Sequence, residues 1–276
     1  MSVFPVVKGV RLRATKINSC GLPIGGEANR LVTDGFVSVE LAPVMRDAQD
    51  LEQVNAEGAV CVTDRTPPTR KYYTVTVELC QVNTGLISMF NGWSQVLDYA
   101  NNSVGFEDDD DVDSDYGVAL EVWTGGRADD DCPTQENDSV FAATSTGQSH
   151  GYLLFGANEF TMGNVKVDAN ISTFTLTGRT IALSQWGRGP YNVVPTDAAG
   201  TAGRLLKPLD RDAHFLLQRT SIAPPPVTPG AAPVALDITG TFVDPKFYFG
   251  GPSGAPATDV APEQVIPLSD AAAVAA

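Results

Sequence analysis

Histidine is scarce in this sequence, and its few cysteines are widely spaced. The 276 residues include two histidines, His150 and His214, and four cysteines, Cys20, Cys61, Cys80 and Cys132. A zinc site needs more closely spaced ligands, such as a CxxC pair. The pattern GxSxG occurs once, as GQSHG (147–151), and so short a match is weak evidence for a nucleophile by itself. The sequence therefore indicates a protein that is not an enzyme and needs no cofactor or metal, with its thiols serving as small buried hydrophobic groups.

Basic residues are fewer than acidic residues, and long apolar runs are absent from the sequence. The chain has 18 Lys and Arg against 33 Asp and Glu, a formal net charge of −15. Electrostatic binding of nucleic acid needs clustered basic residues, so DNA is expected only as a cargo that does not stick. No run of 18 apolar residues predicts a membrane span. Basic residues interrupt the N-terminal sequence MSVFPVVKGVRLRATK, so we expect no signal peptide and synthesis in a cytoplasm.

What the sequence does contain is alternation with a period of two residues, which is typical of β-strands with one dry and one polar face. The runs FVSVEL (36–41), YYTVTVEL (72–79), VALEVW (118–123) and ISTFTLT (171–177) show it most clearly. The first two predict a hairpin over 35–41 and 72–80. Further strands are expected at 10–17, 60–63, 151–155, 180–184 and 213–220.

One helix interrupts the strands. Asn83 and Thr84 can cap a helix over 85–92. Its apolar stripe is formed by Leu86, Ile87, Met89 and Phe90. One short helix among many strands predicts a mainly β fold, a β-sandwich or open barrel with one flanking α-helix.

Two long loops and a proline-rich extension complete the organisation. Residues 42–70 and the acidic segment 101–116 are expected to be loops that contact a neighbouring molecule. Prolines at 224–226, 229 and 233 predict a stiff linker, followed by a hairpin around Asp244 and Pro245. We therefore divide the chain into a main β domain, 1–222, and a C-terminal extension, 223–276.

The acidic segment invites a calcium hypothesis. Asp111, Asp113 and Asp115 have the one-three-five spacing of an EF-hand loop. However, the glycine stands at the seventh position, and Val122 occupies the twelfth, where a bidentate glutamate is required. A solvated acidic loop that keeps copies apart is favoured.

Nine further segments matter for their order and spacing: CGLP (20–23), GFVSVE (35–40), AVCVTD (59–64), VELCQV (77–82), VALEVWTG (118–125), GYLL (151–154), FTLTG (174–178), WGRGPYNVV (186–194) and HFLLQ (214–218). Taken together, they resemble the major tail proteins (tail tube proteins) of siphophages that infect actinobacteria. The resemblance spans roughly 10–226 and does not include the aspartate run at 108–111 or the extension.

The resemblance implies a structural virion protein of the phage tail. Six copies would form a ring, and stacked rings would form a hollow tube through which DNA leaves. Its partners would be other copies of itself and the tape measure, tail terminator and distal tail proteins. Alternatives are another tail ring protein (distal tail or connector), a calcium-dependent β-rich adhesin module and, least favoured, a hydrolase.

Within a tube wall, the hairpin would have a lumen face and a core face. Duplex DNA carries about one charge per 1.7 Å, so a lumen should not be basic. The expected lumen face is Ser38, Glu40, Thr74, Thr76 and Glu78. The expected core face is Val37, Val39, Val75, Val77 and Leu79. A slip of one residue would exchange the two faces.

Overall fold

The computed structural model describes residues 8–81, 83–110, 114–125, 150–163, 173–196, 200–230 and 232–236. These residues form fifteen strands and one helix, α1 (Thr84–Asn91), so the predicted mainly β class is confirmed. Within them, no helix has the length and apolar character to span a membrane. The strands are β1 (Gly9–Asn18), β2 (Gly26–Thr33), β3 (Phe36–Arg46), β4 (Gln49–Val54), β5 (Val60–Thr66), β6 (Thr69–Leu79), β7 (Ser94–Leu97), β8 (Ser103–Glu107), β9 (Tyr116–Thr124), β10 (His150–Met162), β11 (Phe174–Ile181), β12 (Val194–Pro195), β13 (Ala202–Gly203), β14 (Phe215–Thr220) and β15 (Val234–Leu236).

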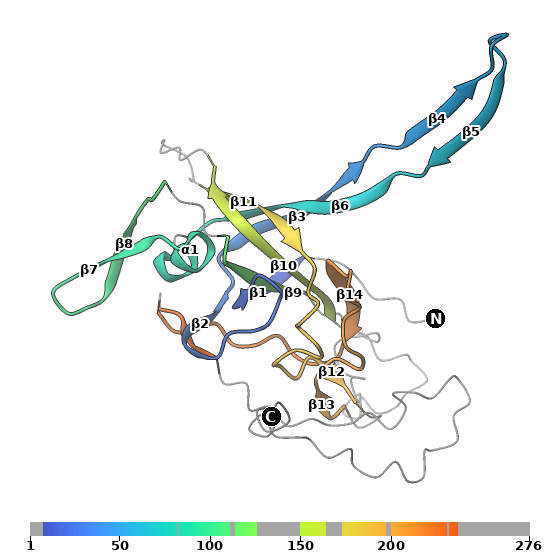
Figure 1. The fold of residues 1–276 in the computed structure, drawn as a ribbon. Coiled ribbons are helices and arrows are strands. Elements are labelled where there is room, and N and C mark those ends of the chain that lie inside the picture. Colours follow the sequence, from blue (N-terminus) through green and yellow to red (C-terminus); the bar gives the residue numbers. More distant parts are fainter. Residues whose placement is uncertain are drawn as a thin grey trace, which may run out of the picture.

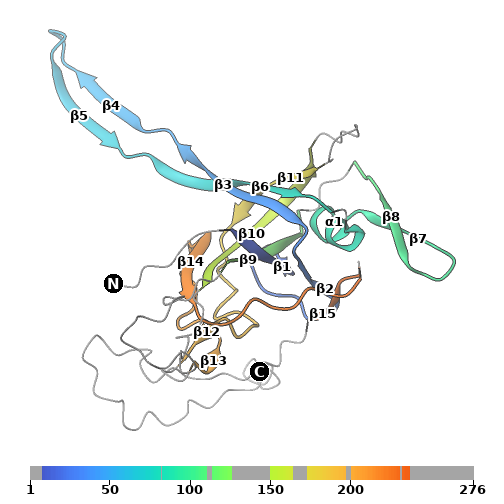
Figure 2. The same ribbon diagram turned by 180° about the vertical axis from the view of Figure 1, so that it is seen from behind.

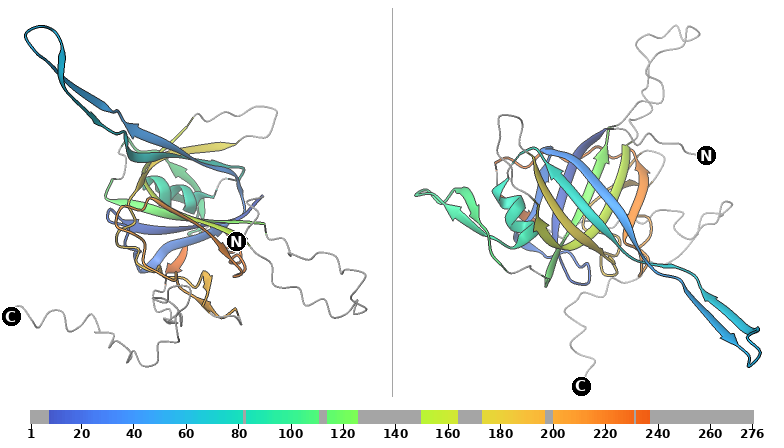
Figure 3. Two further views of the ribbon diagram at one scale, coloured as in Figure 1. Left: turned by 90° about the vertical axis from the view of Figure 1, so that its right-hand side faces the viewer. Right: turned by 90° about the horizontal axis from the view of Figure 1, so that it is seen from above.

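Nine of these strands form one antiparallel sheet in the order β15-β2-β1-β9-β10-β11-β6-β3, with β14 joined to β10. β10 is the central strand. One side of it pairs with β9, while the other pairs with β14 along its first half and with β11 along its second half. The sheet curls over, so that β3, β6 and β11 lie opposite β1 and β2 with α1 between them (Figures 1 and 3).

The concave side of the sheet holds the larger core. Leu12 of β1, Val77 of β6, Leu120 of β9 and Leu176 of β11 are fully buried there. Gly9 lets the two ends of the curled sheet approach, because a Cβ at this position would lie 2.8 Å from the ring of Phe36 on β3. Burial of apolar surface from seven strands and the helix drives the sheet to close on itself.

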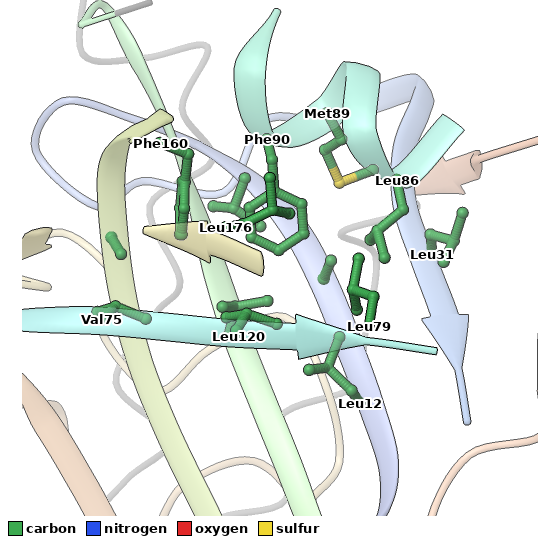
Figure 4. Packing of buried hydrophobic residues seen from close by; sticks show 14 of the residues in the cluster. Leu12, Leu31, Val75, Leu79, Leu86, Met89, Phe90, Leu120, Phe160 and Leu176 are labelled. Carbon is green, nitrogen blue, oxygen red and sulfur yellow. The ribbon is translucent and has the colours of Figure 1, made fainter. Parts of the chain in front are cut away.

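The helix forms directly after Asn83, the predicted capping residue. It begins at Thr84, one residue earlier than expected. The side chain of Asn83 accepts a hydrogen bond from the Leu86 amide (3.0 Å), and Gly92 ends the helix in the left-handed conformation. The structure buries the whole predicted stripe, Leu86, Ile87, Met89 and Phe90. Phe90 packs edge-on against Phe160 of β10, with ring centroids 4.5 Å apart (Figure 4).

A second core covers the opposite face of β1, β9 and β10. The segment 181–209, which contains β12 and β13, packs Leu183, Trp186 and Leu205 onto Trp123 of β9 and Tyr152 of β10. The expectation that β9 has one polar, solvated face is therefore wrong. Ala119, Glu121 and Trp123, the face expected to be polar, are at most 1% exposed.

The prediction of a loop over 42–70 is wrong, although the strand expected at 60–63 is present within β5. β3 and β6 continue beyond the body, and β4 and β5 extend them as a long two-stranded hairpin that projects from the molecule (Figures 1 and 2). We call residues 49–66 the arm. Period-two alternation is weak there because neither face of the arm lies on the core. The predicted loop at 101–116 is also partly wrong, since Ser103–Glu107 is strand β8, paired with β7.

The first part of the predicted extension lies on the main sheet. Thr228 exchanges hydrogen bonds with Val32 of β2, and β15 pairs with β2 through Val234 and Arg30. The boundary expected at residue 222 thus assigns a strand of the main sheet to the extension. The hairpin expected around Asp244 and Pro245 lies outside the described residues.

Candidate assembly surfaces

The hairpin expected over 35–41 and 72–80 is present as β3 and β6. Its register pairs Val39 with Val77 and Leu41 with Val75. Val75, Val77 and Leu79 are fully buried, and Val39 packs against the same core from a half-buried position. Ser38 and Glu40 are exposed, and Thr74, Thr76 and Glu78 are half-buried, so the five expected lumen residues lie on the side of the sheet away from the core.

Val37 is the exception among the expected core residues, and that prediction is wrong. The side chain is 53% exposed. The pairing shifts between Phe36 and Ser38, which face Leu79 and Glu78, so Val37 is the extra residue of a β-bulge. A bulge reverses the alternation on one side of itself. As a result Phe36 packs on the core, while Val37 points away from it together with Ser38.

The polar face of this hairpin is continuous across both strands. The Ser38 hydroxyl donates a hydrogen bond to the Glu78 carboxylate across the pair (3.2 Å). Glu40 lies next along β3, opposite Thr76. β3 pairs only with β6 among the described strands, so its other backbone edge is a site where another strand can add.

The arm has no contact with the body that would bury its side chains. Every side chain described between 49 and 66 is exposed, including Leu51 (58%) and Val60 (53%). An exposed ion pair between Asp50 and Arg65 (3.4 Å) joins the two strands, and such pairs contribute only about 0–1 kcal/mol. A two-stranded hairpin is marginally stable in water by itself. The arm is therefore an exposed projection that the body of the molecule does not stabilise.

A second projection lies on the other side of the body. β7 and β8 form a short hairpin beside α1 (Figure 1). Asp98 fixes its turn by accepting hydrogen bonds from the Ala100 and Asn102 amides, and these bonds, foremost those of Asn102, lower the pKa of Asp98. The hairpin exposes Val96, Leu97, Tyr99 and Val104.

A third exposed apolar area lies on β14. Phe215 and Leu217 point outward, 39% and 46% exposed. Phe215 contacts the Tyr73 ring edge-on (5.4 Å), and the Arg70 guanidinium lies over that same ring. His214, beside them, bonds to Thr180 (2.7 Å). Burial, and then the Arg70 charge, lower the pKa of His214.

A buried ionic network holds β1, β9 and β10 together, and sequence reasoning missed it. The Arg13 guanidinium donates two hydrogen bonds to the Glu121 carboxylate, each 2.6 Å long. The Tyr152 hydroxyl donates a third to that carboxylate (2.6 Å), and the Tyr191 ring stacks on Arg13. The one signal of this network in the sequence is Glu121, a glutamate inside the apolar run VALEVW. The same pattern is equally typical of a glutamate exposed on the polar face of a strand.

This network has the properties of a structural element. Glu121 is fully buried and its oxygens have three donors, so it has no access to a substrate. Burial, and next the Glu121 charge, raise the pKa of Tyr191 to about 12 and that of Tyr152 well above its usual value. Burial by itself would lower the pKa of Arg13, but the charge and hydrogen bonds of Glu121 raise it.

No cluster of three or more His, Cys, Asp or Glu side chains suited to a metal is found in the described part of the chain. Asp111 and Asp113 of the calcium hypothesis lie outside that part, as does Cys132. Cys20, Cys61 and Cys80 are free thiols and exposed, so the expectation that the cysteines are mostly buried is wrong for these three.

No protein-family model matches the chain, and no curated protein is significantly similar to it.

Proposed function

We propose that the chain is a structural subunit of a phage tail, which self-assembles into hexameric rings that stack into the hollow tail tube. The observation that carries the proposal is the arm, an exposed two-stranded hairpin with apolar side chains and no support from its own body. Segments of this kind gain their stability from a neighbouring molecule. A second copy in the next ring is the neighbour that a stacked tube supplies.

The unpaired edge of β3 supports the same proposal. Exposed strand edges promote pairing with other chains, and a closed ring of subunits removes them. If copies join through this edge, β3 and β6 form the inner wall, and Ser38, Glu40 and Glu78 line the channel. Repeated glutamates would make that wall acidic. Screening limits electrostatic effects to about 8 Å at physiological salt, so only residues on the wall would act on the DNA. An acidic wall has the same charge sign as the phosphates and lets DNA slide without binding.

Electron microscopy of the purified full chain tests the proposal. We expect negative stain to show hollow rods of uniform diameter. Isolated rings would favour another tail ring protein, such as a distal tail or connector protein. A protein that stays monomeric at every concentration would contradict self-assembly.

Deletion of the arm separates stacking from folding. A variant in which a two-residue Asn-Gly turn replaces residues 49–66 should keep the far-ultraviolet circular dichroism of a β protein, because the arm does not contribute to either core. It should form no rods. A matched control keeps the arm's length and the turn-forming Asn55, whose side chain accepts hydrogen bonds from the Glu57 and Ala59 amides, but replaces Ala56 and Glu57 with serine, and it should assemble normally. Rods formed by the deletion variant would contradict the role given to the arm.

A further inference from the structure

Two exposed surfaces on opposite sides of the body complement each other. The β7–β8 hairpin lies at one side and β14 at the other, as the front and back views both show (Figures 1 and 2). Each exposes apolar side chains that a solitary molecule would leave in water: Tyr99 and Val104 on the hairpin, Phe215 and Leu217 on β14. Identical copies joined through two different surfaces make a head-to-tail contact, and repetition of that contact gives a closed ring when the rotation between neighbouring copies closes.

The charges of the two surfaces are opposite. No Lys or Arg occurs between Lys71 and Arg127, so the hairpin and the segment that joins it to β9 carry only acidic formal charges. Asp98 lies in the hairpin turn, and Glu107, Asp108 and Asp110 are exposed where the hairpin returns to the body.

The β14 surface carries the basic residues. Arg70 lies over Tyr73 and donates a hydrogen bond to the main-chain oxygen of Asp212 (3.2 Å), which brings it beside His214 and Phe215. Arg211 is exposed between two exposed carboxylates, Asp210, which pairs with Lys207 (3.5 Å), and Asp212. The four basic residues Arg70, Lys207, Arg211 and Arg219 outnumber these two acidic ones, so the surface keeps a net positive charge. Arg219 shares the alternation of Phe215 and Leu217 along β14. In a chain of net charge −15, basic residues gathered beside exposed aromatic and aliphatic groups are the surface that an acidic copy can approach without repulsion.

We infer that the β7–β8 hairpin and the acidic residues 107–110 of one copy dock on β14, Arg70 and Arg211 of the next copy, and that this contact closes the ring. The inference rests on the proposed function and adds the surfaces that it uses. It also gives Asp108 and Asp110 a role: their carboxylates select the basic face of a neighbour and repel a second acidic face, which fixes the direction of assembly.

Charge reversal on each surface, followed by mixing, tests the contact. The acidic-side variant is Asp108→Lys with Asp110→Lys, and the basic-side variant is Arg70→Glu with Arg211→Glu. Each variant alone brings like charges together and should raise the concentration at which rings form more than about tenfold. Mixed in equal amounts, the two variants should assemble again, because every reversed surface then meets a reversed partner. Native mass spectrometry should show rings with equal numbers of both variants.

Controls make the outcomes distinct. Circular dichroism checks that both variants fold, and Glu27→Lys with Asp34→Lys, on β2 and beside it, changes the net charge as much as the acidic-side variant and should assemble like the wild type. Assembly of the wild type should weaken as salt rises to 1 M, where the screening length is about 3 Å. If the wild type forms rings and either variant does so equally well, or if mixing restores nothing, the inference is wrong while the proposed function stands. If the control also loses assembly, the effect is one of net charge and the inference is wrong. A wild type that never assembles overturns both.

Discussion

Replacement of Glu121 by leucine should destabilise the protein severely, although leucine is apolar and close in size to glutamate. The side chains of Glu121 and Arg13 are 0% and 6% exposed. Without Glu121, the Arg13 guanidinium would keep its charge in the interior with its main partner gone, which costs about 3–5 kcal/mol. The Tyr152 hydroxyl would also lose its acceptor, at about 1–3 kcal/mol. Because whole domains are stable by only about 5–15 kcal/mol, the variant should be close to unfolding.

The double variant Arg13→Met with Glu121→Leu should recover most of that loss. It removes both charges, and apolar replacement of a whole buried ion pair is often neutral or stabilising. Urea unfolding of wild type, both single variants and the double variant gives the coupling free energy. Dilute protein should be used, because assembly would add stability of its own. A Glu121→Leu protein as stable as the wild type, or a double variant as unstable as the single one, would refute the reasoning.

Three further predictions concern the β3–β6 hairpin and Tyr191. Val77→Asp should abolish assembly by placing an unpaired charge in the core, whereas Glu78→Gln should leave rods intact in electron micrographs. Rods formed by Val77→Asp would contradict the strand assignment. Phe36→Ser should lower the free energy of unfolding by about 2–4 kcal/mol and Val37→Ser by no more than about 0.5 kcal/mol, and the reverse order in urea unfolding would show that the bulge is misplaced. Burial and the Glu121 charge hold the pKa of Tyr191 near 12 when folded, against about 10 when unfolded, so its contribution is intact below pH 10 and is lost as pH rises towards 12. Urea midpoints should therefore fall more steeply over this range in the wild type than in Tyr191→Phe, and equal slopes would count against the assignment.

Local patterns in the sequence predicted the helix and several strands, because these elements depend on residues a few positions apart. Asn83 and the stripe from Leu86 to Phe90 predicted the helix, because a side-chain cap and apolar spacing are both short-range properties. Alternation predicted β1, β3, β6, β9 and β14, and the pairing of β3 with β6 followed from their matched faces. The candidate hairpin was thus largely readable from the chain, apart from Val37.

Other features depended on what the rest of the chain covers. Glu121 alternates with apolar residues as an exposed residue would, yet it is buried because the segment 181–209 folds over β9 and because Arg13, 108 positions earlier, supplies its countercharge. Apart from the strand expected at 60–63, the arm looked like a loop because no core face imposes alternation on it. The bulge at Val37 requires the register of the partner strand.

The sequence by itself determined the mainly β class, the helix and its buried face, and the excess of acidic residues, because these depend on composition and on neighbours a few positions apart. The tertiary structure decided which strand faces are covered, that residues 42–70 project as a hairpin, and that the acidic end and β14 lie on opposite sides of the body. Those features arise from contacts between residues distant in the chain, and no local pattern encodes them.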